Sequence, residues 1–503
     1  MKLFVGVDVG TQGTKAALFD RAGRCVGRAF VPSRLIQPRP GVVEEDPERQ
    51  FDSVCQAIRS ALAASRADAA NVAGVGIDGQ MAGVVGVGRT GRNVTPYDSW
   101  LDTRCAEYIE QMSRSAGDEV LAKTGGPVSF NHGPKILWWM HTRPAVYRRI
   151  AAFVQPAGYA VMRLCGLGAS DAFIDKTYLH FSGFADNRAG RWDEALCKRF
   201  GLDIAKLPRI VDCCAVVGEV TQASAKLCGL KPGTPVVAGC GDTVASFLSA
   251  GAVDAGVTVD VAGTASVFAA TVSGFRADRK ARTLSCGQSA TPGLWHAYAY
   301  INGGGLNLEW FRKQIVGTSG KGVELARLDR EAGRIAPDAS LPIFVPHLGG
   351  RNNPSQPRLR GAWVGLSWSH SAAHLYRAIL EAVALEYAVY QSVVRSLYGA
   401  NCVRELRVTG GGAKNPLWNQ IKADVLGVPV RRIAASEGAT LGSAMVAAVG
   451  VGAVADLKSA ARWVRLARPA QPNRRLAGYY ADRVAAYRKL VEQLDGALPV
   501  SQG

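Results

Sequence analysis

Residues 3–19 read Leu-Phe-Val-Gly-Val-Asp-Val-Gly-Thr-Gln-Gly-Thr-Lys-Ala-Ala-Leu-Phe, and this stretch decides the fold. Two apolar, β-branched and glycine-containing runs flank the turn at residues 10–14, a pattern typical of two strands joined by a tight turn. The pattern returns at residues 257–268, where Asp260 again lies in an apolar run before a Gly-Thr turn. Apolar residues recur at helical spacing between and after these hairpins, for example over residues 372–397. The sequence therefore predicts an internally duplicated α/β fold.

The first turn carries groups that suit a polyphosphate. Glycines let backbone N–H groups approach phosphate, while hydroxyl and ammonium groups add donors. The predicted phosphate-binding residues are Gly10, Thr11, Gln12, Thr14 and Lys15. An acid so close to phosphate is unfavourable unless a divalent cation lies between them, so we expect Asp8 to organise Mg²⁺ through water. Taken alone, the segment fits a plain hairpin with a surface aspartate equally well.

Two further glycine turns complete the predicted nucleotide site. Transfer of a γ-phosphoryl group needs donors from both walls of a cleft, which favours Gly263 and Thr264 in the second hairpin. The turn at residues 409–416 ends a predicted strand, and backbone without side chains can lie against adenine. Its predicted contacts are Gly411, Gly412 and Asn415. The alternative is a simple strand-to-helix turn.

Asp242 is the candidate general base. It follows the apolar run at residues 235–238 and lies in Gly239-x-Gly241, where small neighbours leave room for a substrate. A sugar hydroxyl is a poor nucleophile, so a carboxylate that accepts its proton supplies what the transfer needs. The alternative is an aspartate that caps the following helix.

Two segments carry groups typical of sugar contacts. Gln80, Met81 and Ala82 follow the predicted strand at residues 75–78. Trp100 and Asp102, with Arg104 nearby, combine an aromatic plane with an acid and a base. Taken singly, Trp100 fits a core position and Asp102 with Arg104 an ordinary surface pair.

Composition bounds the class of protein. The chain has 503 residues, which predicts two domains, and 48% hydrophobic with 20% charged residues, an ordinary globular balance. Its 11 cysteines form no Cys-x-x-Cys pair, and no apolar stretch spans a bilayer, so we expect a cytoplasmic protein without a membrane partner. The net charge of +18 is spread along the chain, which favours a solvated basic surface over a nucleic-acid partner.

Together these segments resemble the FGGY family of carbohydrate kinases, in order across nearly the whole chain. Further matching segments are residues 41–47, 360–366 and 410–418. The resemblance implies an α/β protein of two ribonuclease-H-like, actin-like ATPase domains that flank a catalytic cleft. It places the first domain at residues 1–245 and the second at residues 246–503. It also implies ATP and Mg²⁺, with Asp242 as the catalytic aspartate.

Within the family, the Gly-Gln-Met and Trp-x-Asp-x-Arg segments look most like xylulose kinases. That likeness implies D-xylulose as substrate, with contacts at Gln80, Met81, Ala82, Trp100, Asp102, Asp242 and Thr243. Xylulose kinases usually have histidine where this chain has Ala82, and asparagine where it has Thr243. Residues 174–180 also depart from the run common in relatives. Loss of a polar partner changes discrimination among hydroxyls, so ribulose or another pentulose stays an alternative.

Two other classes of protein share features with a sugar kinase. A non-catalytic sugar or nucleotide sensor shares the fold, but such a protein is expected to lose Asp8 or Asp242. An actin-like or chaperone ATPase shares the paired hairpins, but has no need of the segments near Gln80 and Trp100. In-line transfer to sugar rather than water requires domain closure. The oligomeric state is left open, with a homodimer as one alternative.

Overall fold

The computed structural model describes residues 2–317, 321–434, 437–495 and 497. Its first sheet has seven strands in the order β13-β14-β5-β1-β2-β3, with β15 also paired to β5. Their bounds are β1 Leu3–Gly10, β2 Gly13–Phe19, β3 Cys25–Pro32, β5 Val72–Gly79, β13 Val216–Glu219, β14 Pro235–Val237 and β15 Cys240–Gly241. The quoted opening stretch thus forms two neighbouring strands near the middle of this sheet.

The second sheet repeats the first. Its order is β18-β19-β17-β16-β22-β23. The bounds are β16 Gly256–Ala262, β17 Ser266–Ser273, β18 Ser285–Gln288, β19 Leu294–Ile301, β22 Val403–Thr409 and β23 Val430–Arg432. β1 pairs antiparallel with β2 and parallel with β5, and β16 does the same with β17 and β22. The predicted duplication of the hairpins is therefore confirmed.

Helices cover both faces of the first sheet, because side chains of β1 alternate between two apolar clusters. Leu3, Val5, Val7 and Val9 pack with α1 Pro47–Ser65, α5 Pro156–Cys165 and α7 Gln222–Cys228. Phe4 packs with α8 Asp242–Ser249 and α13 Ala439–Gly450. Period-two alternation between two covered faces is what a buried strand requires.

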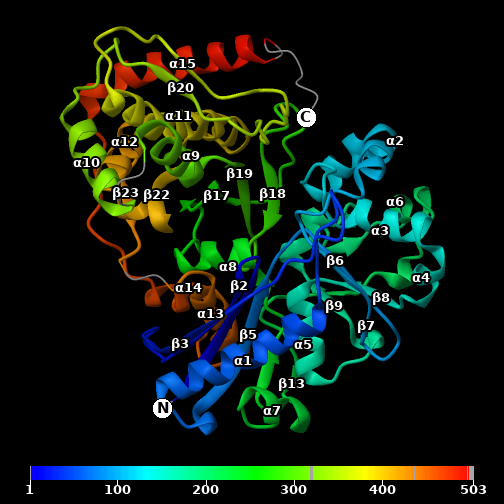
Figure 1. Cartoon of the computed structure of the whole chain (residues 1–503). Helices are drawn as coiled ribbons and strands as arrows, with labels where there is room; N and C mark the ends of the chain where they lie inside the picture. Colours follow the sequence, from blue (N-terminus) through cyan, green and yellow to red (C-terminus); the bar gives the residue numbers. More distant parts are fainter. Residues whose placement is uncertain (1, 318–320, 435–436, 496, 498–503) are drawn as a thin grey trace.

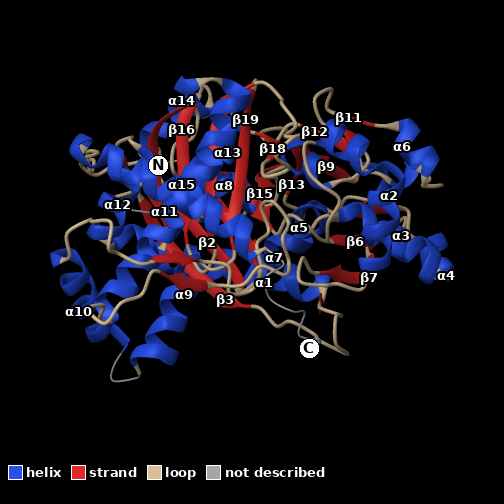
Figure 2. Ribbon diagram, turned by 90° about the horizontal axis from the view of Figure 1, so that it is seen from above, coloured by secondary structure: helices blue, strands red, loops and turns tan. Residues whose placement is uncertain are grey.

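The second sheet has its own helical layer. The helices are α9 Gly304–Trp310, α10 Lys321–Arg334, α11 Ala372–Tyr398, α12 Pro416–Leu426 and α15 Ala477–Leu494. α11 is long and mostly buried, and packs with α12, α15 and the short β20 Ile343–Val345. Figures 1 and 2 show these helices gathered on one side of the molecule, away from α1, α5 and α7.

The C-terminal part of the chain returns to the first sheet. Figure 1 shows α13 and α14 Leu457–Ala460 beside β2, β3 and α8. The backbones approach closely, since a Cβ at Gly6 would lie 1.8 Å from the Thr440 carbonyl oxygen. A division of the chain at residue 245 therefore stays a proposal, because residues 439–463 pack against the N-terminal strands.

A smaller region extends from the first sheet. It contains the four-stranded order β4-β7-β6-β8 and several helices, seen to the right in Figure 1. The bounds are β4 Glu44–Glu45, β6 Val84–Val87, β7 Asn93–Asp98, β8 Ala152–Val154, α2 Ala106–Thr124, α3 His132–Thr142, α4 Pro144–Arg149 and α6 Glu194–Arg199. The short strands β9 Phe173–Asp175, β10 Ala185–Asp186, β11 Arg191–Trp192 and β12 Arg209–Val211, together with β21 Ala362–Val364 beside β20, complete the described strands. Across the described helices, none combines the length and apolar character that a membrane crossing requires.

Candidate active site

The first hairpin places Asp8 and Lys15 opposite each other across β1 and β2. The Lys15 Nζ lies 3.5 Å from an Asp8 carboxylate oxygen. Gly13 has φ 152°, and a Cβ there would lie 2.3 Å from the Val31 carbonyl oxygen, so the turn requires glycine. Burial raises the pKa of Asp8 above its ordinary value, and the Lys15 ammonium opposes that rise. The hairpin therefore presents the Asp8 carboxylate and the Lys15 ammonium group together.

Asp242 begins α8, directly after β15. β15 lies beside the end of β5, where Gly241 is level with Gly79. Gly239 has φ 77°, and a Cβ there would lie 1.8 Å from the Ile77 carbonyl oxygen, so only glycine allows this approach. The Asp242 carboxylate accepts hydrogen bonds from the Thr243 N–H at 2.5 Å and the Thr243 hydroxyl at 3.1 Å. Burial and then the charge of Asp8 raise the pKa of Asp242 to about 7.

A single cavity of about 720 Å³ joins these groups. Residues of the N-terminal half that line it include Asp8, Gly10, Lys15, Asp242 and Thr243. From the C-terminal half come Val261, Gly410, Gly411, Lys414 and Arg432. Asp8 and Asp242 thus share one cleft, which is walled by the first turn and by the turn at residues 409–416. Phosphoryl transfer between bound partners needs such an arrangement.

A second cavity of about 590 Å³ continues this cleft, since Gly411 and Lys414 line both. Its lining includes the predicted residues Gly263, Thr264, Gly412 and Asn415. Asn415 caps α12 by accepting from the Trp418 N–H at 3.0 Å, and its amide nitrogen donates to Asp329 at 2.7 Å. Trp418 and Tyr376, both almost fully buried, also line this cavity.

Three predicted residues of the first turn point elsewhere. Thr11, Gln12 and Thr14 are not among the residues that line the 720 Å³ cavity. The Thr11 hydroxyl accepts from the Trp100 indole N–H at 2.8 Å, and the Thr14 hydroxyl lies 2.6 Å from that of Ser53. The side chains of Thr11 and Thr14 therefore hold the turn in place, and a phosphate contact from any of the three residues stays a prediction.

Asp78 is a third acid, to which the sequence reasoning gave no role. It is fully buried on β5, level with Asp8 on β1 and with Cys240 on β15. The Ser443 hydroxyl donates to it at 2.5 Å, and its other oxygen has no partner among the described residues. Burial, followed by the charge of Asp8, raises the pKa of Asp78 well above its ordinary value. An acid that ends an apolar strand two residues before Gln80 is the signal that could have identified it.

Asp260, the counterpart of Asp8 in the second hairpin, has a different environment. It is fully buried, with the Lys422 Nζ at 2.5 Å and the Tyr387 hydroxyl donating at 2.7 Å. Lys422 in turn lies 4.0 Å from the centre of the Trp418 ring. The duplicated acids therefore differ, because one lines the cleft and the other is neutralised inside the second half.

The predicted sugar segments lie on the N-terminal side of Asp242. Met81 packs on Gly241, where a Cβ would lie 2.4 Å from the Met81 methyl carbon. Gln80 is buried and donates to Glu45 at 2.9 Å. Ala82 follows in a partly exposed position, while Trp100 is 48% exposed. None of these four predicted residues is among those that line the 720 Å³ cavity, and their contact with sugar stays a prediction.

Asp102 has a full set of protein partners. It is fully buried, and its carboxylate accepts from the Val43 N–H at 2.7 Å and from the Arg104 guanidinium at 2.7 to 2.9 Å. The buried Lys135 donates to the carbonyls of Ser99 and Asp102. This network fixes the loop that presents Trp100, and a contact of Asp102 with sugar stays a prediction.

The segment at residues 174–180, which departs from the family pattern, forms a wall near Asp242. Tyr178 donates to the carbonyl of Gly79 at 3.1 Å. His180 and the Tyr298 hydroxyl on β19 lie 2.6 Å apart. The charge of Asp242 contributes to the raised pKa of both tyrosines after burial. The two halves of the chain therefore meet beside the candidate base through a buried histidine–tyrosine contact.

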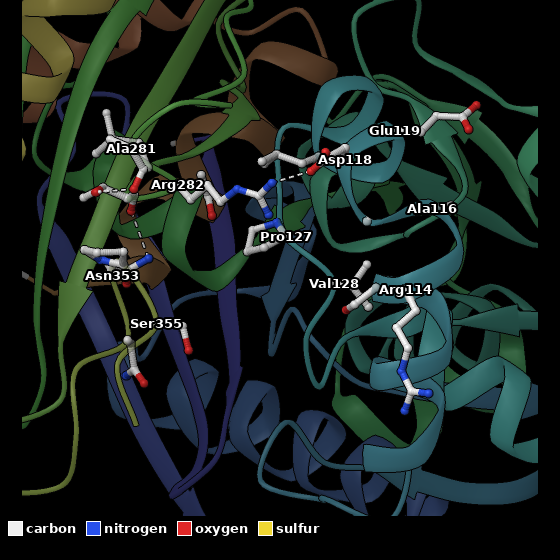
Figure 3. A pocket seen from close by; sticks show the side chains of 18 of the residues that line it. Arg114, Ala116, Asp118, Glu119, Pro127, Val128, Ala281, Arg282, Asn353 and Ser355 are labelled. Carbon is white, nitrogen blue, oxygen red and sulfur yellow. Dashed lines mark hydrogen bonds and ion pairs between the residues drawn. The ribbon is translucent and has the colours of Figure 1, made fainter. Parts of the chain in front are cut away.

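Another cavity, of about 800 Å³, lies between α2 and the segments at residues 281–285 and 352–355. Figure 3 shows Arg282 pointing across it to Asp118, with which it forms an ion pair. None of the predicted site residues lines it. It is therefore a second opening between the two halves, separate from the cleft at Asp8 and Asp242.

The chain is similar to known kinases in sequence and in structure. The chain is 25% identical to a xylulose kinase of Bacillus subtilis, over 98% of this chain and 96% of that protein. It is 28% identical to an autoinducer-2 kinase of Klebsiella pneumoniae, over 97% of this chain and 93% of that protein. A crystal structure of xylulose kinase from Rhodospirillum rubrum superposes with a TM-score of 0.90 at 27% identity, and covers 98% of this chain and 99% of that one.

These neighbours are sugar kinases of the actin-like ATPase fold, which confirms the predicted pair of domains flanking a cleft. The model of the N-terminal domain of the FGGY family of carbohydrate kinases matches residues 3–249, and that of the C-terminal domain matches residues 259–451. The chain therefore belongs to the FGGY family of carbohydrate kinases and is a phosphotransferase that uses ATP as phosphoryl donor.

Proposed function

We propose that this kinase phosphorylates a pentulose, with D-xylulose as the first candidate and D-xylulose 5-phosphate as the product. The observation that carries the proposal is the shared cleft, in which Asp8 and Asp242 face glycine turns from both halves. The xylulose kinases among the similar proteins support the choice of sugar, as do Met81, which packs on Gly241 next to Asp242, and Trp100, which donates to Thr11 of the first turn.

Asp242 is the proposed general base. A sugar hydroxyl transfers its proton to the Asp242 carboxylate as its oxygen attacks the γ-phosphorus of ATP, and the bond to ADP breaks. The pKa of about 7 suits this role, because a base is most effective when its pKa lies near the working pH. Lys15 and the N–H groups of Gly10 and Gly411, which line the same cleft, are the proposed donors that stabilise negative charge on the phosphates.

Asp8 is the proposed organiser of Mg²⁺. Its carboxylate lines the cleft and has a half-exposed lysine as ion-pair partner, so it is accessible to a hydrated cation. Within the described ranges, no three His, Cys, Asp or Glu side chains form a ready metal site. The single carboxylate of Asp8 fits Mg²⁺ that is otherwise held by phosphate and water, a common arrangement for this ion. Bound there, the cation neutralises charge on the triphosphate.

Ribulose is the runner-up substrate, because Ala82 and Thr243 stand where xylulose kinases usually carry histidine and asparagine. A non-catalytic sensor is less well supported, since Asp8 and Asp242 are both present and line the same cavity. The test is an assay of ADP release with Mg²⁺ and ATP across D-xylulose, L-xylulose, both ribuloses, hexuloses and polyols. The proposal predicts the highest kcat/KM with D-xylulose. A higher value for a hexulose or polyol, or no release with any sugar, would contradict it.

A further inference from the structure

A third, smaller cavity of about 200 Å³ lies behind the first phosphate turn. Gly10 lines both this cavity and the catalytic cleft, so the turn is the wall between them. Val9 and Thr14 of the first hairpin also line it. The other lining residues come from the end of β3 and the segment after it, from β4 and from the start of α1; they include Ser33, Arg34, Glu45, Asp46, Arg49, Gln50 and Ser53. Nothing in the proposed reaction uses this space.

Gln50 points to a missing ligand. It is only 6% exposed, and its amide nitrogen faces the Glu45 carboxylate as a hydrogen-bond donor. Its amide oxygen has no hydrogen-bond partner in the part of the chain that the structure describes. A buried amide oxygen without a donor is unfavourable, and a hydroxyl group supplies that donor whereas a bare apolar group does not.

The charges around the cavity favour an anion. Arg34 is exposed at its mouth, and Arg49 makes only a 3.7 Å ion pair with Asp46. α1 begins at this cavity, so the positive end of a 19-residue helix faces it. Of the two acids present, Asp46 accepts from the Glu48 N–H as the cap of α1, and Glu45 accepts from the Gln80 amide at 2.9 Å.

Hydrogen bonds connect residues that line this cavity to the first phosphate turn. The Ser33 hydroxyl donates to the carbonyl of Thr11 at 2.5 Å, and the Ser33 N–H donates to the carbonyl of Gln12 at 3.1 Å. On the other side, Ser53 contacts the Thr14 hydroxyl at 2.6 Å. A molecule held between Ser33 and Ser53 therefore fixes the backbone that we propose to bind phosphate.

We propose that this cavity binds a small phosphorylated polyol, with its phosphate at Arg34 and Arg49 and a hydroxyl at Gln50. Arginines match phosphate geometry through paired N–H donors. The volume corresponds to roughly seven water molecules at about 30 Å³ each, which admits the polyol part while the phosphate stays at the mouth. A free phosphate ion shares the anionic chemistry, but offers less for the buried amide. The proposed product, a sugar phosphate, has both a phosphate group and hydroxyl groups, so the inference rests in that respect on the proposed function.

The test is calorimetric titration of the full chain with D-xylulose 5-phosphate, in saturating ADP, with inorganic phosphate and D-xylulose as separate arms. The wild type should show a second binding event for the sugar phosphate alone. Arg34→Gln and Gln50→Leu should each weaken that event at least tenfold and keep the first event, whereas Arg39→Gln, an exposed arginine outside the cavity, should leave both unchanged. Hydrogen exchange over residues 30–53 should slow on binding in the wild type and not in Gln50→Leu.

Several outcomes would overturn the inference. Binding of the sugar phosphate that neither Arg34→Gln nor Gln50→Leu weakens would do so, as would no binding at all. Equal affinity for inorganic phosphate would remove the role of the hydroxyl, and equal affinity for D-xylulose would remove the role of the arginines. Failure of the proposed function shows separately, because it removes the event that both variants keep and leaves the event that they weaken.

Discussion

Asp242 combines two properties that a general base for an alcohol needs. It faces the cleft, and its surroundings oppose its ionisation, because burial and the nearby Asp8 both disfavour a second negative charge. The Thr243 N–H and hydroxyl hold the carboxylate in one orientation. The same burial that makes the base effective therefore also makes it costly to keep charged.

The pH dependence of kcat/KM should follow Asp242. The base works only when deprotonated, and its pKa is raised to about 7, so kcat/KM should rise as the pH passes through about 7 and then level off. The measurement is kcat/KM for the preferred sugar at saturating ATP and Mg²⁺ from about pH 5.5 to about pH 8.5. A flat profile across this range would show that this carboxyl does not limit the reaction.

Removing the charge of Asp242 should stabilise the fold. The folded-state pKa of about 7 exceeds the ordinary 3.8, so the folded state binds more protons between these values, and stability falls as the pH rises through them. Asp242→Asn should therefore raise Tm, by more at about pH 8 than at about pH 4.5. Thermal unfolding of both forms at the two pH values measures this. An equal or negative change at the higher pH would contradict the assigned environment.

At the scale of elements, the two hairpins have diverged in the use of their acids. Asp8 on β1 faces the cleft, whereas Asp260 on β16 is held by Lys422 from α12 and Tyr387 from α11. Lys422 also packs against Trp418, which lines the continuation of the cleft. The second hairpin thus anchors α12 and the wall of the nucleotide site.

Lys422→Met should destabilise the protein by about 3–5 kcal/mol, because it leaves Asp260 charged and buried without its partner. The double variant Asp260→Asn, Lys422→Met should recover a large part of this loss. Urea unfolding of the wild type, both single variants and the double variant gives the comparison. If the two single losses simply add in the double variant, the pair is not coupled as the geometry indicates.

Local patterns explain which elements and residues could be predicted. Both hairpins, the glycine turns and Asp242 follow from strand runs and turn residues in short windows, and the structure has these elements. Asp78, Asp329 and Trp418 join the site through strand register and helix packing, which no short window contains. The direction of Thr14 depends on Ser53, a contact 39 residues away. The packing of α13 on β1 depends on a close approach at Gly6, so it too was hidden from local reasoning.

Across the whole molecule, several polar contacts join the halves, among them hydrogen bonds between Asn187 and Gln288 and from the Cys286 N–H to the Gly125 carbonyl. His180 contacts Tyr298 beside the cleft, and Arg282 pairs with Asp118 across the separate cavity in Figure 3. Arg282 and Asp118 are mostly exposed, and exposed ion pairs contribute little to stability. Relative movement of the halves is therefore the default expectation.

Substrate should compact the protein, because transfer to sugar rather than water requires solvent to leave the cleft. Small-angle scattering with the preferred sugar plus a non-hydrolysable ATP analogue should give a smaller radius of gyration than either ligand alone. A sugar that the enzyme does not phosphorylate is the matched control. An unchanged radius with both ligands bound would contradict closure.

The central claim is that Asp242 takes the proton from the sugar hydroxyl in a cleft formed by both halves. Its most direct test is sugar-dependent ADP release by Asp242→Asn beside the wild type, with Mg²⁺, ATP and the preferred sugar. The account predicts a fall in kcat of about 10²–10⁴-fold, with sugar binding retained in calorimetry. A variant that keeps kcat within a few fold of the wild type would contradict the claim.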